Sequence, residues 1–252
     1  MLAVLSATLV RIIGLVRLAS LVPSLRCSAL IFDLDGVLLD SNAIYEHHWK
    51  AWASRNSVPF ESIIAVHHGR PVSATIREVA PHLDAHVQAR AYKASLEAAR
   101  SLEGARIFPG VLEMLDALPP GAWAIATSAP ADFAHKLADH LGLPLPRVFV
   151  TGDDVLRGKP HPMPYLRAAE ALGVPAAQCM VVEDAPAGVT SARAAGAFVI
   201  GVLTTNTAEA LAEAHAITRS TADISVRCDA HGLQVSWLEP GSGTTAEDAL
   251  LY

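Results

Sequence analysis

Apolar and polar positions follow two different patterns in this chain, and the change lies near residue 107. After that point, short apolar runs alternate with segments whose apolar residues recur at helical spacing. The runs predict strands over residues 123–127, 148–150, 179–182 and 198–203, and the segments predict helices over 111–118, 132–141, 165–172 and 186–196. Such alternation is typical of a doubly wound α/β fold with a mostly parallel sheet. Two last runs, 223–227 and 233–237, predict a closing hairpin.

An earlier apolar run, residues 30–32, predicts a buried strand that ends at Asp33, Leu34, Asp35 and Gly36. The segment from residue 42 to 106 reads as helical throughout. We therefore predict an α/β core made of residues 27–41 and 107–238, interrupted by an all-helical cap over residues 42–106. Because the cap follows the first strand directly, it should lie over the carboxyl end of that strand as a lid.

The two ends of the chain differ from the rest. Residues 1–26 hold three arginines and no acid among many Leu, Val and Ile. A stable membrane span is disfavoured, because Arg11 and Arg17 would each cost roughly 2.5–3.5 kcal/mol in its middle. We interpret this segment as an N-terminal extension ahead of the domain, and leave targeting or membrane association open. The Gly-, Ser- and Thr-rich tail over residues 239–252 is predicted to be flexible.

The composition narrows the class of protein. The 252 residues are 52% hydrophobic and 17% charged, which suits one large domain or a core with an insertion. The net charge of −6 argues against a nucleic-acid partner. Cys27, Cys179 and Cys228 form no CxxC pattern and are odd in number, so we expect reduced thiols and a cytoplasmic protein.

Four polar clusters fall at or beside the carboxyl ends of predicted strands, which share one edge of a parallel sheet. They are Asp33 with Asp35, Thr127 with Ser128, Lys159 with Pro160, and Glu183 with Asp184. Such an edge is where open α/β sheets bind their ligands. Two carboxylates a few ångströms apart repel by about 4 kcal/mol at an intermediate dielectric, so the first cluster calls for a cation.

The stretches that hold these clusters resemble the haloacid dehalogenase superfamily of phosphotransferases, over about residues 27–237. They are the residues 32–37 (FDLDGV), 126–128 (ATS), 158–162 (GKPHP) and 182–188 (VEDAPAG). Within the superfamily the chain looks most like the sugar and polyol phosphatases of the 2-deoxyglucose-6-phosphate phosphatase and glycerol-1-phosphatase kind. The resemblance implies a Mg²⁺-dependent phosphatase that acts on small phosphorylated sugars or polyols through an aspartyl-phosphate.

The resemblance also implies a role for each cluster. Asp33 is the expected nucleophile, and Asp35 is the acid that protonates the leaving oxygen and then the base that activates water. Thr127, the Ser128 backbone N–H and Lys159 are expected to hold the phosphoryl oxygens. Mg²⁺ is expected between Asp33, the backbone carbonyl of Asp35 and Asp184, with Glu183 either a further ligand or a group just behind the ligands.

Substrate choice is expected to belong to the cap. Arg70, beside Gly69, is the candidate for binding substrate hydroxyls or a distal phosphate. Tyr45, Glu46 and Trp49 follow the active-site loop by one helical turn and are candidates for the mouth of the cap. His67 and His68 are interpreted as scaffold or surface rather than substrate contacts, and Trp49 and Trp52 as a core stripe.

Other functions remain open on the sequence. A phosphomutase of the β-phosphoglucomutase kind would use all four clusters but must exclude water and hold a second phosphate. A phosphonate-cleaving enzyme would need a cap lysine for a Schiff base, and Lys50 and Lys93 are the lysines of the predicted cap. A binding or regulatory protein on this scaffold is disfavoured because every expected catalytic position is filled. We expect a monomer or weak dimer.

Overall fold

A parallel sheet of six strands lies at the centre of the computed structural model, which describes residues 22–99 and 101–241. Its strand order is β6 (Val148–Val150), β5 (Trp123–Ala126), β2 (Ala29–Phe32), β7 (Cys179–Glu183), β8 (Phe198–Val202) and β9 (Ala216–Thr218). All neighbouring pairs are parallel. The predicted fold class is therefore confirmed, although β9, only three residues long, was not predicted.

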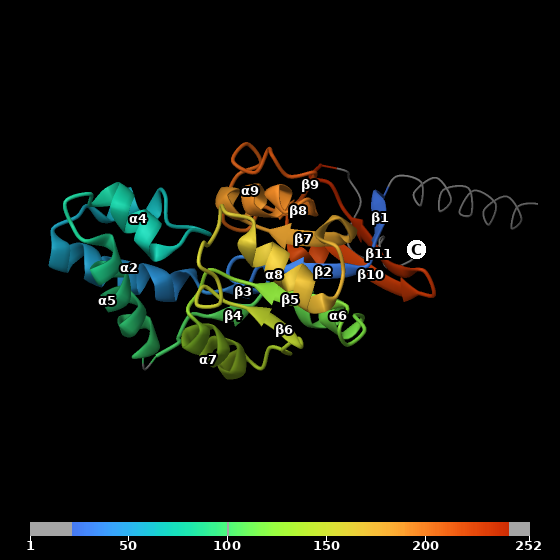
Figure 1. The fold of residues 1–252 in the computed structure, drawn as a ribbon, viewed down its shortest axis with the longest axis horizontal. Coiled ribbons are helices and arrows are strands. Elements are labelled where there is room, and N and C mark those ends of the chain that lie inside the picture. Colours follow the sequence, from blue (N-terminus) through green and yellow to red (C-terminus); the bar gives the residue numbers. More distant parts are fainter. Residues whose placement is uncertain (1–21, 100, 242–252) are drawn as a thin grey trace, which may run out of the picture.

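Helices cover both faces of the sheet (Figure 1). On one face, Leu30 and Phe32 of β2 pack in a cluster with residues of α6 (Val111–Asp116) and α7 (Ala131–Leu141). On the other, Ala29 and Ile31 pack with residues of α8 (Met163–Leu172) and α9 (Pro186–Ala194). Successive side chains of a strand point to opposite faces, so a fully apolar run such as β2 can be buried on both sides.

A second, antiparallel sheet joins β1 (Ser24–Cys27) to the hairpin of β11 (Gly232–Trp237) and β10 (Ile224–Asp229). The hairpin was predicted, but β1 was not: the sequence interpretation assigned residues 1–26 to an extension, and β1 pairs in register with β11 from residue 24 onward. Residues 1–21 and 242–252, which hold the rest of that extension and most of the tail, lie outside the described residues. No helix in the described ranges has both the length and the apolar character to cross a membrane.

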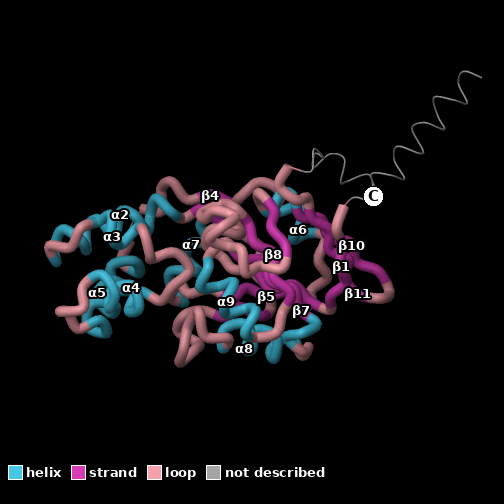
Figure 2. Tube along the Cα trace, turned by 90° about the horizontal axis from the view of Figure 1, so that it is seen from above, coloured by secondary structure: helices cyan, strands magenta, loops and turns pink. Residues whose placement is uncertain are grey.

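The cap contains α2 (Asn42–Asn56), α3 (Phe60–Ile64), α4 (Val72–Val79) and α5 (Ala85–Glu97). It lies at one end of the molecule in both views of the chain (Figures 1 and 2). The predicted core stripe is present: Trp49 and Trp52 are 2% and 1% exposed and meet edge to face. A short pair, β3 (Leu39–Asp40) with β4 (Arg106–Ile107), joins the two ends of the insertion to the core.

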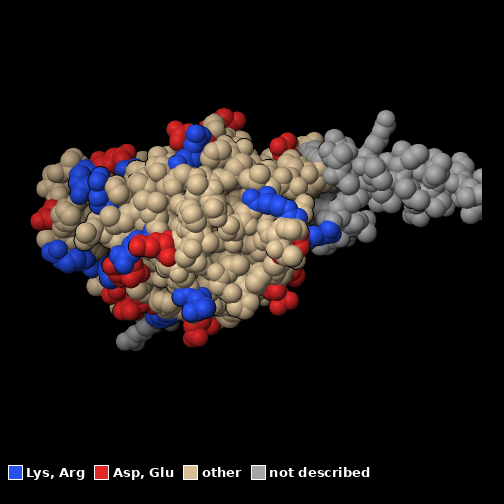
Figure 3. All heavy atoms as spheres, turned by 45° about the vertical axis from the view of Figure 1, so that its right-hand side comes forward, with Lys and Arg blue, Asp and Glu red and all other residues tan. Residues whose placement is uncertain are grey.

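Two 3-10 turns, η1 (Ala176–Gln178) and η2 (Thr221–Asp223), complete the described elements. On the face that Figure 3 shows, basic and acidic side chains lie near one another rather than in separate large areas. This mixture matches the moderate net charge of the sequence.

Candidate active site

Lys159 lies between two carboxylates at the carboxyl edge of the sheet. Its Nζ donates hydrogen bonds of 2.7 Å to Oδ1 of Asp33, directly after β2, and of 2.7 Å to Oε1 of Glu183, the last residue of β7. All three side chains are buried. Burial alone would lower the pKa of Lys159, but the charges of Asp33 and Glu183 raise it above its ordinary value. The lysine is therefore charged, and it is held by residues far apart in the sequence.

The carboxylate of Glu183 is bonded on both oxygens. Oε1 also accepts a hydrogen bond from the Tyr165 hydroxyl at 2.7 Å, and Oε2 accepts from the backbone N–H groups of Asp184 and Ala185. A Cβ on Gly188 would lie 1.5 Å from Oε1. Gly188 thus leaves the space in which Glu183 sits, and Glu183 orients Lys159.

Asp35 is held from three directions. Ser41 Oγ donates to its Oδ1, and the Tyr45 hydroxyl donates to Oδ2 at 3.2 Å, with Thr127 Oγ1 at 3.5 Å. Burial raises the pKa of Asp35 above its ordinary value, although these hydrogen bonds oppose the shift. A raised pKa favours the protonated form, which a general acid requires.

The loop after β8 supports Asp184, although its residues were not among the predicted site residues. Thr205 Oγ1 donates to Oδ2 of Asp184, the Asn206 side chain donates to its backbone carbonyl, and Thr204 Oγ1 donates to the carbonyl of Gly36. The rule that located the other clusters, polar side chains directly after a strand of the parallel sheet, also fits Thr204, Thr205 and Asn206.

Three acids form a potential cation site. Oxygens of Asp33, Glu183 and Asp184 lie within 4.8 Å of one another. Oδ1 of Asp184 is buried without a hydrogen-bond partner among the described residues. Burial, with the charges of Glu183 and Asp33, raises the pKa of Asp184 well above its ordinary value. Carboxylate oxygens with an unpartnered lone pair fit a hard divalent cation.

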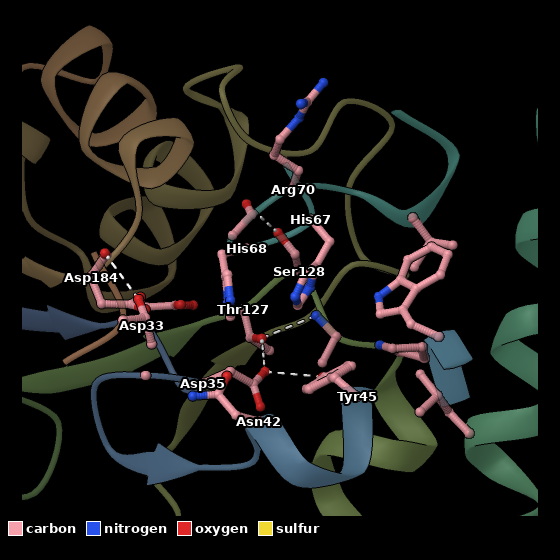
Figure 4. Close-up of a pocket in the computed structure, with 18 residues that line it drawn as sticks. Asp33, Asp35, Asn42, Tyr45, His67, His68, Arg70, Thr127, Ser128 and Asp184 are labelled. Atoms are coloured by element: carbon pink, nitrogen blue, oxygen red, sulfur yellow. Dashed lines mark hydrogen bonds between the residues drawn. The ribbon is translucent and has the colours of Figure 1, made fainter. Parts of the chain in front are cut away.

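A cavity of about 70 Å³ opens above these groups, between core and cap. Asp33, Asp35, Thr127, Ser128 and Asp184 line it from the core (Figure 4). The cap contributes Tyr45, Trp49, His67, His68, Gly69 and Arg70. The four predicted clusters therefore meet at one place, with Lys159 directly behind Asp33.

The cap candidates occupy different positions. A Cβ on Gly69 would lie 2.4 Å from Cβ of Ala185, so this glycine permits close approach of cap and core. Arg70 pairs with Glu78 at 2.7 Å, and Figure 4 shows its side chain directed away from Asp33 and Asp35. Glu46 pairs with Lys50 at 3.1 Å on an exposed part of α2 and does not line the described cavity.

Two histidines and one lysine of the cap also lie close to the core. His67 and His68 both line the cavity and extend toward Thr127 and Asp35 (Figure 4), which the interpretation as scaffold or surface did not anticipate. Lys93 bonds Asp153 of the core at 2.7 Å, so it joins cap to core.

Comparisons with known proteins identify the family of the chain. A family model described as haloacid dehalogenase-like hydrolase matches residues 27–196. Hexitol phosphatase A of Escherichia coli (strain K12) is 41% identical over 184 residues, which cover 71% of this chain and 84% of that protein. Glycerol-1-phosphate phosphohydrolase 2 of Saccharomyces cerevisiae is 34% identical over 193 residues, 72% of this chain and 77% of that protein.

Among solved structures, a hydrolase from Pseudomonas syringae superposes with a TM-score of 0.67 at 26% identity, covering 77% of this chain and 94% of that one. The region that the family model matches, residues 27–196, contains β2, the whole cap and the clusters that hold Lys159 and Glu183. The chain belongs to the haloacid dehalogenase-like hydrolase family.

Proposed function

We propose that the protein is a Mg²⁺-dependent phosphatase that hydrolyses small phosphorylated sugars or polyols through an aspartyl-phosphate on Asp33. One observation carries this proposal: Asp33 lines the cavity between core and cap, beside the charged Lys159, and the separately held acid Asp35 lines the same cavity. The likeness to a hexitol phosphatase and a glycerol-1-phosphate phosphohydrolase supports the substrate class.

In the first step, a carboxylate oxygen of Asp33 forms a bond to phosphorus while the bond from phosphorus to the leaving oxygen breaks. Lys159, the Thr127 hydroxyl and the Ser128 backbone N–H hold the phosphoryl oxygens as charge develops on them. A contact in the structure supports this role for Thr127: its Oγ1 accepts a hydrogen bond from the Ala129 backbone N–H at 3.0 Å.

Asp35 gives its proton to the leaving oxygen and later takes a proton from the water that attacks the aspartyl-phosphate. Ser41 and Tyr45 hold its carboxyl group in place for both steps. General acid–base catalysis of this kind contributes roughly 10²–10⁴ in rate. In the second step water oxygen bonds to phosphorus, and Asp33 is released.

Asp33, Asp184 and the backbone carbonyl of Asp35 would hold Mg²⁺. The ion would neutralise negative charge on the phosphoryl group and on the acids around it. Glu183, whose two oxygens accept four hydrogen bonds from the protein, is assigned to positioning Lys159.

The phosphomutase alternative requires a group for a second phosphate. Among the residues that line the cavity, Arg70 is the one lysine or arginine, and Glu78 engages it. This favours hydrolysis over isomerisation. A cytoplasmic location, a monomeric or weakly dimeric state and the absence of a nucleic-acid partner remain predictions.

The test measures phosphate release from a panel of sugar and polyol phosphates, with hexose phosphate isomerisation followed in the same samples. We expect Asp33→Asn to lower kcat at least about a thousandfold, and chelation to abolish turnover until Mg²⁺ is restored. Asp229→Asn, which changes an exposed aspartate of β10, is the matched control. Equal rates for Asp33→Asn and the control, or full turnover after chelation, would overturn the proposal.

A further inference from the structure

His67 carries a buried nitrogen that the protein leaves unpaired. The residue is only 9% exposed, and its Nε2 has no hydrogen-bond partner among the described residues. Leaving such an atom unpaired costs about 1–3 kcal/mol. A side chain that serves only as scaffold would be expected to pack an apolar group here instead.

The surroundings of His67 make it a neutral, fixed ring. It lies 3.9 Å from the His68 ring and 6.2 Å from Trp49, measured between ring centroids. Its backbone is tied to α3, because its N–H donates to the Ile63 carbonyl. Burial, with a smaller effect of His68, lowers the pKa of His67 to about 3. A neutral imidazole offers one donor and one acceptor, which suits a hydroxyl group.

The position of the His67 ring indicates which part of a bound substrate it would contact. His67 lines the same cavity as Asp33 and Asp35, on the cap side (Figure 4). A phosphoryl group bound at Asp33 and Lys159 leaves the cap side to the rest of the molecule. The cap's lining offers no free cation there among the described residues, since Arg70 pairs with Glu78. An uncharged, hydroxylated leaving group matches this wall.

We infer that Nε2 of His67 hydrogen-bonds a hydroxyl of the leaving group and thereby selects polyol and sugar monophosphates over phosphates of unsubstituted alcohols. The inference rests on the proposed phosphatase activity and adds the residue that recognises the substrate. His67 is a binding residue in this account and takes no part in proton transfer, which belongs to Asp35.

Glycerol 1-phosphate and propyl phosphate test the inference, because they share a chain length and differ in hydroxyl groups. We expect wild type to prefer glycerol 1-phosphate by about tenfold or more in kcat/KM, since a site built to bond a hydroxyl rejects the analogue that lacks it. His67→Leu should remove most of this preference by raising KM for glycerol 1-phosphate, with propyl phosphate changed less than about twofold. His67→Gln, which keeps a polar group, should restore part of it.

His86→Leu, at an exposed position of α5, is the matched control and should leave both substrates unchanged. Thermal unfolding of each variant separates loss of fold from loss of recognition. An equal decrease for both substrates in folded His67→Leu, no decrease, or a wild type without preference would each overturn the inference. If wild type hydrolyses neither compound nor any sugar phosphate, the proposed function itself fails.

Discussion

Replacing His67 with glutamine should weaken the dependence of folding stability on pH. The folded protein holds the pKa of this imidazole at about 3, chiefly because the ring is buried, against an ordinary value of 6.5. Below pH 6.5, the unfolded chain therefore binds a proton that the folded chain does not. Stability rises with pH wherever the unfolded state binds more protons. Above about pH 6.5 the imidazole is neutral in both states, so His67 does not reduce the free energy of unfolding. As the pH falls from 6.5 toward 3, the free energy of unfolding decreases because only the unfolded chain takes up the proton.

The size of the effect follows from the two pKa values. Between pH 7 and pH 5, folded and unfolded pKa values of about 3 and 6.5 change the free energy of unfolding by about 2 kcal/mol. Below pH 3 the loss approaches about 5 kcal/mol, at 1.36 kcal/mol per unit of difference. Glutamine does not titrate, so the free energy of unfolding of His67→Gln lacks this part of the pH dependence.

Urea unfolding of wild type and His67→Gln at a series of pH values between about 7 and 5 measures the difference. As the pH falls over this interval, the free energy of unfolding of wild type should decrease by about 2 kcal/mol more than that of His67→Gln. His86→Gln controls for the loss of an exposed histidine. Parallel curves for wild type and His67→Gln would refute the account, because they would mean that His67 takes up its proton equally in both states.

Three further substitutions test the packing and charge of the site. Gly188→Ala places a Cβ against Glu183. Although alanine gains about 1 kcal/mol in helix propensity, the clash should lower the free energy of unfolding by about 1–3 kcal/mol, measured by urea unfolding, and lower kcat at least tenfold, measured by phosphate release. Asp184→Asn should stabilise the metal-free protein by about 1–2 kcal/mol while abolishing turnover and the stabilisation by added Mg²⁺, as followed by thermal unfolding. Lys93→Met breaks a half-exposed pair with Asp153, so unfolding free energy should change by less than about 1 kcal/mol while KM rises a few-fold.

The central sheet and the polar edge were predictable because each follows from a short-range pattern. Fully apolar runs such as residues 29–32 fix buried parallel strands, and parallel strands bring their carboxyl ends to one edge. That rule alone gathers Asp33, Thr127 and Glu183, whatever the loops between them do. The cap was predictable for a similar reason, since a continuous helical segment was inserted directly after the first strand.

The rest depends on contacts between distant residues. The pairing of β1 with β11 joins residues about two hundred positions apart, and the run Ser24–Cys27 is only four residues long, too short for its alternation of polar and apolar residues to distinguish it from an extension. The inward orientation of His67 is set by the turn after α3 and by packing against Trp49, neither of which leaves a periodic signal. Ser41 and Tyr45 donate hydrogen bonds to Asp35 because of the path that the chain takes into α2, and this path likewise leaves no periodic signal.

The charges of the site explain why its residues are so closely held. Asp33, Glu183 and Asp184 are buried with one lysine, and burial raises the pKa of both Asp33 and Asp184 above their ordinary values. Acids that are packed together in this way destabilise the fold unless a cation joins them. A site built only for stability would replace one of them with an apolar or neutral residue. Oδ1 of Asp184 is also left unbonded by the described residues, so the cluster has an oxygen available for a cation, which is the role we propose for it.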